Sequence, residues 1–124
     1  MSTERKEKGR AGENLVVDFL LKNEYEILEQ NWRYLKSEVD IIALNKQSSE
    51  ICFVEVKTRK SKDFGNPETF VSKRQQKMII EAAQAYLIQN NIEEEARFDV
   101  AGVILRSNGP GEIDYIKGAF YPTL

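Results

Sequence analysis

Histidine is absent from this 124-residue sequence, and cysteine and proline are scarce, with one and three residues. Without imidazole the chain cannot build a Ser-His-Asp or Cys-His catalytic group, or a zinc site that needs histidine ligands. The single cysteine, Cys52, excludes an internal disulfide framework and fits a reducing compartment. Its apolar neighbours indicate a small buried side chain rather than a reactive thiol.

Long hydrophobic runs are also missing. No stretch approaches the roughly 20 apolar residues that a membrane-spanning helix needs, and no apolar segment follows the charged N-terminus. We therefore expect a cytoplasmic protein that does not enter the membrane. The length suits a single domain over residues 1–124 that buries its own core. Residues 1–8 are charged and lack periodicity, so we expect them to form a flexible arm.

The net charge of −2 argues weakly against a nucleic-acid partner, but the charges are unevenly distributed. Between residues 57 and 77 there are seven basic and two acidic residues, a local charge of +5. The basic members are Lys57, Arg59, Lys60, Lys62, Lys73, Arg74 and Lys77. This cluster is either a phosphate-binding surface or an ordinary solvated face.

Two apolar runs of strand length, residues 38–45 and 50–58, carry charge where a buried strand should carry none. Because side chains alternate across a strand, Glu55 and Lys57 share one face, and Glu38 and Asp40 share a face of their own strand. If residues 45–50 form the turn of a hairpin, Asp40 and Glu55 converge. Two buried carboxylates cost several kcal/mol unless a cation or hydrogen bonds compensate, so their pairing predicts a metal site.

The remaining chain alternates between helical and strand patterns. We expect a helix over about 9–23, with Glu13 on the shoulder of its apolar stripe, and a first strand over 25–33. A loop over 61–71 precedes a helix that opens at Ser72, with Gln75 in the capping-box position, and ends at residues 90–91. Strands over 97–105 and 113–117 follow, and residues 119–124 are expected to be coil.

The element order is therefore α-β-β-β-α-β, with a final β. A helix between the strands at 50–58 and 97–105 favours their parallel pairing, whereas the hairpin strands pair antiparallel. The sequence predicts an α/β fold with a mixed β-sheet flanked by helices.

A hard divalent cation such as Mg²⁺ or Mn²⁺ needs only one or two protein carboxylates. Asp40 and Glu55 supply these, and the carbonyl of Val56 lies within reach of a metal held by Glu55. Lys57 could orient a water molecule or stabilise charge that develops on phosphorus. A Glu-x-Lys tripeptide alone is weak evidence for a metal site, because an ordinary ion pair on a half-exposed strand has the same pattern. Apolar residues on both faces of this strand and the acidic neighbouring strand favour the metal site.

Several ordered motifs resemble the YraN-like family of uncharacterised bacterial proteins, and the resemblance covers about residues 9–105. The motifs are Gly9-Arg10-Ala11-Gly12-Glu13, Asn31-Trp32-Arg33, Glu38-Val39-Asp40-Ile41-Ile42, Phe53-Val54-Glu55-Val56-Lys57-Thr58-Arg59 and Arg97-Phe98-Asp99-Val100. That family resembles the PD-(D/E)xK nuclease superfamily, which includes Holliday-junction resolvases. The resemblance implies a restriction-endonuclease-like fold.

The resemblance also implies roles for individual residues. Glu13 matches the glutamate of the first helix, Asp40 the central metal-binding aspartate, and Glu55 with Lys57 the Glu-x-Lys pair. Gln76 matches a polar residue of the following helix. Two positions depart from the pattern: Val39 replaces the proline before the aspartate, and Gln75 stands where a basic residue is expected.

The function implied is a Mg²⁺-dependent endonuclease that hydrolyses phosphodiester bonds of DNA, including branched or damaged DNA. Arg59, Lys60, Lys73 and Arg74 are the candidate nucleic-acid contacts. The alternative is a nucleic-acid-binding or scaffold module that keeps the fold and no longer cuts. Symmetric cutting of two strands would call for a homodimer, although no stretch of the sequence identifies an interface.

Overall fold

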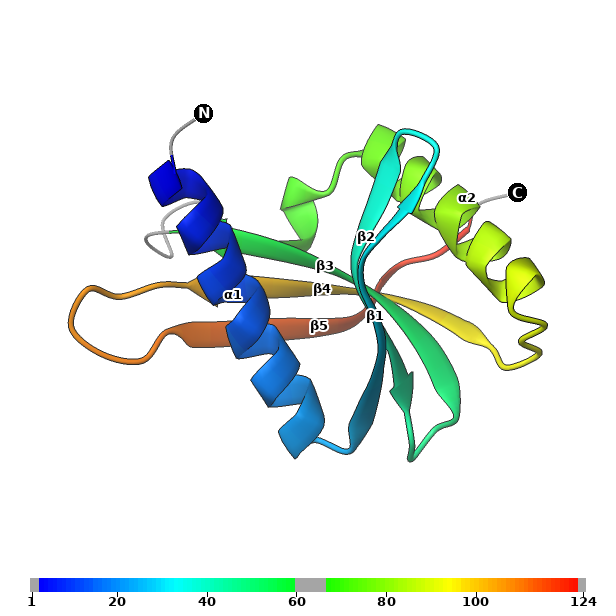
Figure 1. Ribbon diagram of the computed structural model, residues 1–124, viewed down its shortest axis with the longest axis horizontal. Helices are drawn as coiled ribbons and strands as arrows, with labels where there is room; N and C mark the ends of the chain where they lie inside the picture. Colours follow the sequence, from blue (N-terminus) through cyan, green and yellow to red (C-terminus); the bar gives the residue numbers. More distant parts are fainter. Residues whose placement is uncertain (1–2, 60–66, 123–124) are drawn as a thin grey trace.

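A computed structural model describes residues 3–59 and 67–122 of the chain, apart from the side chains of residues 3–8, 67 and 68. It consists of a five-stranded sheet with helices on both faces (Figure 1). The element order is α-β-β-β-α-β-β, so the predicted α/β class and order are confirmed. The elements are α1 (Thr3–Lys22), β1 (Tyr25–Tyr34), β2 (Ser37–Asn45), β3 (Glu50–Arg59), the 3-10 helix η2 (Pro67–Phe70), α2 (Lys73–Gln89), β4 (Ala96–Ile104) and β5 (Glu112–Phe120).

The five strands lie in sequence order, β1-β2-β3-β4-β5. All neighbours pair antiparallel except β3 and β4, which pair parallel because α2 returns the chain between them. The predicted hairpin of β2 and β3 is confirmed, with Asn45 opposite Glu50. The predicted capping box is also confirmed: Ser72 caps α2, and Gln75 completes the reciprocal hydrogen bond.

The sheet divides between β2 and β3, and this division positions the candidate site. Pairing of the two strands ends at Ile41 and Val54. Beyond that point β2 stays paired with β1 as far as Ser37, while β3 stays paired with β4 as far as Arg59. The two strands therefore form a fork, and Asp40 and Glu55 are the first residues beyond it.

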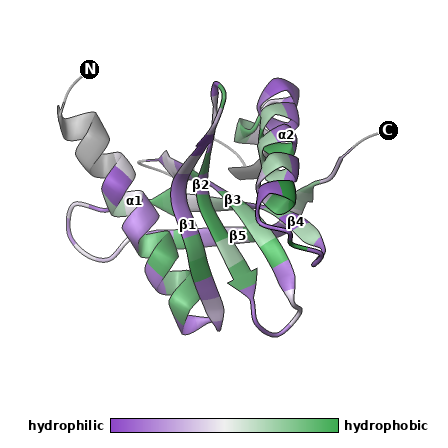
Figure 2. Ribbon diagram, turned by 45° about the vertical axis from the view of Figure 1, so that its right-hand side comes forward, coloured by the Kyte–Doolittle hydropathy of each residue, from purple (hydrophilic) through white to green (hydrophobic). Residues whose placement is uncertain are grey.

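The helices cover opposite faces of the sheet. Ile51 and Phe53 of β3 pack in the cluster that includes α2, whereas Cys52 and Val54 pack in the cluster that includes α1. Figure 2 shows the hydrophobic colour concentrated on the central strands and on the carboxy-terminal half of α1. Hydrophobic burial is proportional to apolar area, so these two clusters are the main source of stability.

A buried network of polar side chains ties the strands together at Asp99, whose side chain is fully buried. Asp99 accepts hydrogen bonds from Arg97 Nε and Nη2 at 2.9 Å, from the Tyr115 hydroxyl at 2.6 Å and from the Gly118 amide at 2.9 Å. Arg97 also donates to Glu50 and Tyr25, so the network spans β1, β3, β4 and β5. A buried charge needs this degree of pairing to be tolerated.

Two element boundaries and one loop differ from the prediction. The 3-10 helix η2 lies within the predicted loop over 61–71, of which residues 61–66 fall outside the described residues. Helix α1 begins at Thr3 rather than near Gly9, so the backbone of residues 3–8 is helical where we expected a flexible arm. Lys, Arg and Glu have high helix propensity, and a missing apolar stripe shows only that this segment has no core to pack against. Strand β5 extends to Phe120, so the prediction of coil from Ala119 onward was wrong there. The buried Asp99 binds Gly118, and Phe120 stacks on Phe98 at 5.4 Å.

Within the described ranges, no helix is both long and apolar enough to cross a membrane.

Candidate active site

Asp40 sits at the fork between β2 and β3 and makes a contact across it. Its Oδ2 accepts a hydrogen bond from the Val56 amide at 2.8 Å, in the position that a backbone carbonyl of β2 would occupy if the pairing continued. The amide and carbonyl of one strand residue point toward the same neighbouring strand. The Val56 carbonyl is therefore also directed to the β2 side, where Asp40 lies.

Glu55 and Lys57 lie together on β3, as their alternation predicted. Lys57 Nζ is 3.7 Å from Glu55 Oε2, and the side chains are only 18% and 12% exposed, respectively. The other oxygen, Glu55 Oε1, is buried and has no hydrogen-bond partner among the described residues. A buried carboxylate oxygen without a donor is costly unless a proton or a cation satisfies it. A hydrogen bond with Asp40, which requires a proton on the pair, is one of the causes that raise the pKa of Glu55.

The environment of Glu55 disfavours its ionised form. Burial and, after it, the negative charge of Asp40 raise the pKa of Glu55 well above its usual range, and Lys57 opposes this only in part. A cation between the two carboxylates would reverse the effect, because it would favour both charges. Among the described residues, no group of three or more His, Cys, Asp or Glu is arranged to hold a metal. A metal here would rely on Asp40, Glu55 and the Val56 carbonyl.

Glu13 approaches the same region from α1. Burial, followed by the charges of Asp40 and Glu38, raises the pKa of Glu13 to about 7. The absence of a side chain at Gly12 permits this approach, because a Cβ at that position would collide with the Thr58 hydroxyl of β3. Glu13 is thus close enough to Asp40 and Glu38 for their charges to raise its pKa.

Asn31 and Glu38 belong to this group, although neither was predicted as a site residue from the sequence. With its amide nitrogen directed toward the carboxylates, the orientation that satisfies both, Asn31 donates to Glu13 Oε1 at 3.0 Å and to Glu38 Oε1 at 2.9 Å. Asn31 has a positive φ of 52°, which asparagine tolerates better than most residues. The available signal was the asparagine inside a strand pattern and the position of Glu38 two residues before Asp40.

The other predicted site residues make different contacts, lie exposed on α2 or fall outside the described residues. The Gln76 amide nitrogen donates to the Val71 carbonyl at 3.0 Å, so its role at the carboxylates stays a prediction. The Arg59 guanidinium lies 4.0 Å from the centre of the Phe70 ring. Lys73 and Arg74 are exposed in the first turn of α2. Lys60 falls outside the described residues.

The chain is similar to proteins whose names carry no activity. Residues 12–103 match the sequence model of a family described as uncharacterised protein family UPF0102. A UPF0102 protein of Christiangramia forsetii is 42% identical over 118 residues, which cover 95% of this chain and 97% of the relative. One of Flavobacterium psychrophilum is 40% identical with the same coverage. Another, of Acetivibrio thermocellus, is 44% identical over 90% of this chain and 89% of the relative.

Proposed function

We propose that this chain, which belongs to the uncharacterised protein family UPF0102, is a magnesium-dependent endonuclease that hydrolyses phosphodiester bonds of DNA. The observation that carries the proposal is the buried, unpartnered Glu55 Oε1 beside Asp40, with Lys57 on the same face of β3. The motif order, an aspartate on one strand and Glu-x-Lys on the next, supports membership of the PD-(D/E)xK nuclease superfamily.

The residues present fit a hard divalent cation. Asp40 and Glu55 offer carboxylate oxygens, and Val56 offers a carbonyl directed to the same side of β3. A bound Mg²⁺ or Mn²⁺ would supply polarisation of a phosphoryl oxygen and a lowered pKa of the attacking water. The water oxygen bonds to phosphorus, the bond from phosphorus to the bridging ester oxygen breaks, and a proton passes to that leaving oxygen.

Lys57 would stabilise the charge that grows on the phosphoryl oxygens during this reaction. Its ammonium is held beside Glu55 with little exposure, so its electrostatic effect is stronger than that of a solvated lysine. Glu13, with its raised pKa of about 7, could accept or donate a proton near neutral pH. In this proposal Lys57 stabilises charge and Glu13 transfers a proton.

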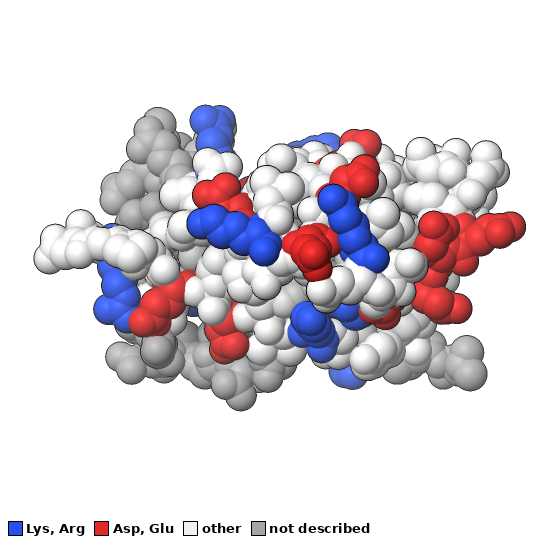
Figure 3. Space-filling model, turned by 90° about the horizontal axis from the view of Figure 1, so that it is seen from below, with Lys and Arg blue, Asp and Glu red and all other residues white. Residues whose placement is uncertain are grey.

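The distribution of charge supports DNA as the substrate. Lys73, Arg74 and Lys77 are exposed on the first two turns of α2, near the tip of the β1–β2 hairpin (Figure 1). Figure 3 shows the face turned away from that tip, where basic and acidic side chains are interspersed and acidic ones gather at one end. Phosphate contacts need a local basic surface, which favours the hairpin side.

The experiment that tests the activity incubates the protein with supercoiled, linear, single-stranded and four-way-junction DNA in Mg²⁺ or Mn²⁺. The matched control is Asp40→Asn, because its amide oxygen can still accept from the Val56 amide while the metal-binding charge is lost. We expect cleavage by the wild type and none by the control. Equal cleavage by the wild type and Asp40→Asn would show that the activity does not depend on Asp40 and comes from a contaminant. This result would contradict the proposal.

Binding is tested separately by charge reversal. The double variant Lys73→Glu/Arg74→Glu should weaken binding to every DNA sequence and make the affinity less dependent on salt concentration, because fewer counterions are released. The control is Lys46→Glu/Lys117→Glu, which changes two other exposed lysines by the same total charge. Equal losses in both double variants would mean that only the net charge matters.

A specific observation favours the second candidate, a module that binds DNA without cutting it. The metal would depend on two carboxylates rather than three, and burial disfavours the charge of Glu55 when no cation is bound. A wild-type protein that binds DNA with the predicted salt dependence and cuts none of the substrates would support this candidate.

A further inference from the structure

The tip of the β1–β2 hairpin contains a leucine in a backbone conformation that leucine rarely adopts. Leu35 and Lys36 form a two-residue turn between the paired residues Tyr34 and Ser37, and Leu35 has a φ of 56°. Glycine or asparagine normally occupies such a position, because a Cβ is strained there. Leu35 is also 83% exposed. Neither strain nor exposure helps the fold, which suggests that the tip serves binding.

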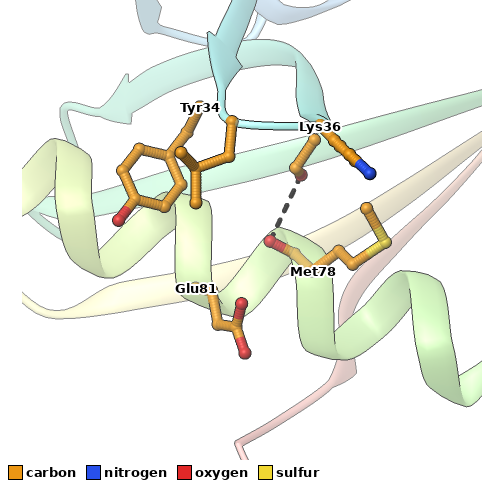
Figure 4. A pocket seen from close by; sticks show the side chains of 6 residues that line it. Tyr34, Lys36, Met78 and Glu81 are labelled. Atoms are coloured by element: carbon orange, nitrogen blue, oxygen red, sulfur yellow. Dashed lines mark hydrogen bonds between the residues drawn. The ribbon is translucent and has the colours of Figure 1, made fainter.

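A pocket of about 420 Å³ opens beside this tip, between the hairpin and α2. Figure 4 shows Tyr34 and Lys36 on the hairpin above Met78 and Glu81 of α2, with the hydrogen bond from the Ser37 hydroxyl to the Met78 carbonyl marked. Its size lies in the range of small-molecule sites, and its lining is mostly apolar with a few polar groups.

The Tyr34 ring is held in place for stacking. It lies parallel to Trp32, with an interplanar angle of 3° and a centroid distance of 6.2 Å. Trp32 in turn contacts Tyr86 of α2 edge-on at 5.2 Å. A planar ligand that stacks on Tyr34 therefore meets a ring that needs little further ordering, which lowers the entropic cost of binding.

The charges at the rim indicate an anionic ligand. Lys36 lines the pocket, Arg74 lies one helical turn before Met78, and Lys77 lies one turn before Glu81. Three positive charges therefore stand against one negative charge. A second copy of the chain docked symmetrically on this surface would bring the same three basic side chains toward their own copies, which is unfavourable. A ligand with planar apolar rings and phosphates satisfies both the pocket and its rim.

We propose that the hairpin tip and its pocket bind an unpaired nucleobase of the DNA substrate. Leu35 wedges against a base step, as apolar side chains of DNA-bending proteins do, and the displaced base stacks on Tyr34. Lys36, Arg74 and Lys77 contact the adjacent phosphates. Lys36 is four residues from Asp40 along β2, about 13 Å in an extended strand. The proposal rests on the proposed function and assigns it a substrate class, DNA with unpaired bases near a branch or flap.

The test measures DNA affinity by fluorescence anisotropy in EDTA, so that no cleavage occurs. One probe is a fully paired duplex and the other is the same duplex with one unpaired base. We expect the wild type to favour the unpaired probe, and Leu35→Asn to lose that preference while it keeps its affinity for the paired duplex. Tyr34→Ala should weaken binding of the unpaired probe by roughly 5- to 150-fold, the range for loss of one base–aromatic stack.

Three controls keep the result interpretable. Asparagine tolerates a positive φ, so Leu35→Asn should fold at least as well as the wild type. Leu35→Met keeps an apolar side chain and should keep the preference. Ile88→Asn removes another exposed apolar side chain, one at the far end of α2, and should change nothing.

The outcomes separate this proposal from the one on which it rests. Absence of binding to both probes by the wild type would overturn this assignment, whereas absence of cleavage in Mg²⁺ or Mn²⁺ would overturn the nuclease proposal on which it rests. Equal binding of both probes would overturn only the assignment of the hairpin. A change of sedimentation coefficient in Leu35→Asn would show that the tip joins two copies of the chain, which also overturns the assignment.

Discussion

The Val56 amide lies 2.8 Å from Asp40 Oδ2, so a side chain completes the strand pairing at the point where the backbone of β2 has diverged. Asp40 therefore has a structural contact in addition to its proposed role as a metal ligand. The two roles can be separated, because an amide oxygen can replace the structural contact but not the charge.

Asp40→Asn should lose Mg²⁺ affinity together with cleavage and keep a melting temperature close to that of the wild type. Asp40→Ala should also lose Mg²⁺ affinity and cleavage. In addition, its free energy of unfolding should fall by about 1–3 kcal/mol, because the substitution leaves the Val56 amide without an acceptor. Calorimetric titration with Mg²⁺ and thermal denaturation measure the two effects. Glu55→Ala should likewise lose metal affinity. Asp40→Asn binding Mg²⁺ as tightly as the wild type would exclude Asp40 as a ligand.

Lys57→Ala should behave differently from the carboxylate variants. It removes a positive charge from beside the cation site, so Mg²⁺ affinity should stay equal or increase. Cleavage should fall by roughly a hundred- to thousand-fold, as for the loss of one preorganised stabilising group. Single-turnover cleavage at saturating Mg²⁺ measures this. An unchanged rate would leave the nuclease proposal standing and make Lys57 a structural partner of Glu55.

Mg²⁺ binding should release protons near neutral pH. Burial and Asp40 raise the pKa of Glu55 above its usual range, so below that pKa the metal must displace a proton before it can use this ligand. Affinity should increase with pH, and about one proton should leave per ion bound. Calorimetry in two buffers with different ionisation enthalpies counts the protons. Glu13→Gln is the control, because it removes the other carboxyl group with a raised pKa and should keep most of the release. A wild-type value of zero would contradict the shift.

Glu13 should make the metal-free protein less stable as the pH rises. Its pKa is about 7 in the folded protein against 4.5 for an unperturbed glutamate, so the folded state holds the proton more tightly. Between these pH values the folded state binds more protons than the unfolded state, and the free energy of unfolding decreases with pH. Melting temperatures from pH 4 to 8 should show a flatter profile for Glu13→Gln. Parallel profiles would exclude this contribution.

The buried network at Asp99 should be far more important for stability than a surface ion pair. Arg97→Met leaves Asp99 buried with an uncompensated charge and should cost about 3–5 kcal/mol. The matched control is Arg106→Met, which breaks the exposed pair with Glu112 and should cost between about 0 and 1 kcal/mol. Urea denaturation of both variants gives the comparison. Similar losses would mean that the network is less important than its burial suggests.

The arrangement of β2, β3 and α2 could be predicted because the signals are local. Alternation places Glu55 and Lys57 on one face of β3. The turn at residues 45–50 sets the register that makes Asp40 and Glu55 the first residues beyond the last pair of the hairpin, and Ser72 with Gln75 marks the start of α2. Each of these inferences needs only residues within a few positions of one another. The element order follows from the same signals.

The parts that could not be predicted depend on contacts between distant residues. Asn31 joins Glu13 and Glu38 only because α1 crosses the sheet at Gly12, and no local pattern shows that approach. The length of β5 depends on Asp99 of β4, which binds Gly118. The strained Leu35 could not be recognised because turn chemistry predicts glycine or asparagine there.

The parallel pairing of β3 and β4 also determines when the site can form during synthesis. Arg59 pairs beside Ile104, so the strand that carries Glu55 and Lys57 leaves the ribosome well before its neighbour does. At ordinary elongation rates of about 5–20 residues per second, roughly 2–9 s separate the two strands. Throughout that interval β3 presents an open edge, which is prone to pair with other chains. The carboxylates therefore reach their final geometry only after β4 has also left the ribosome.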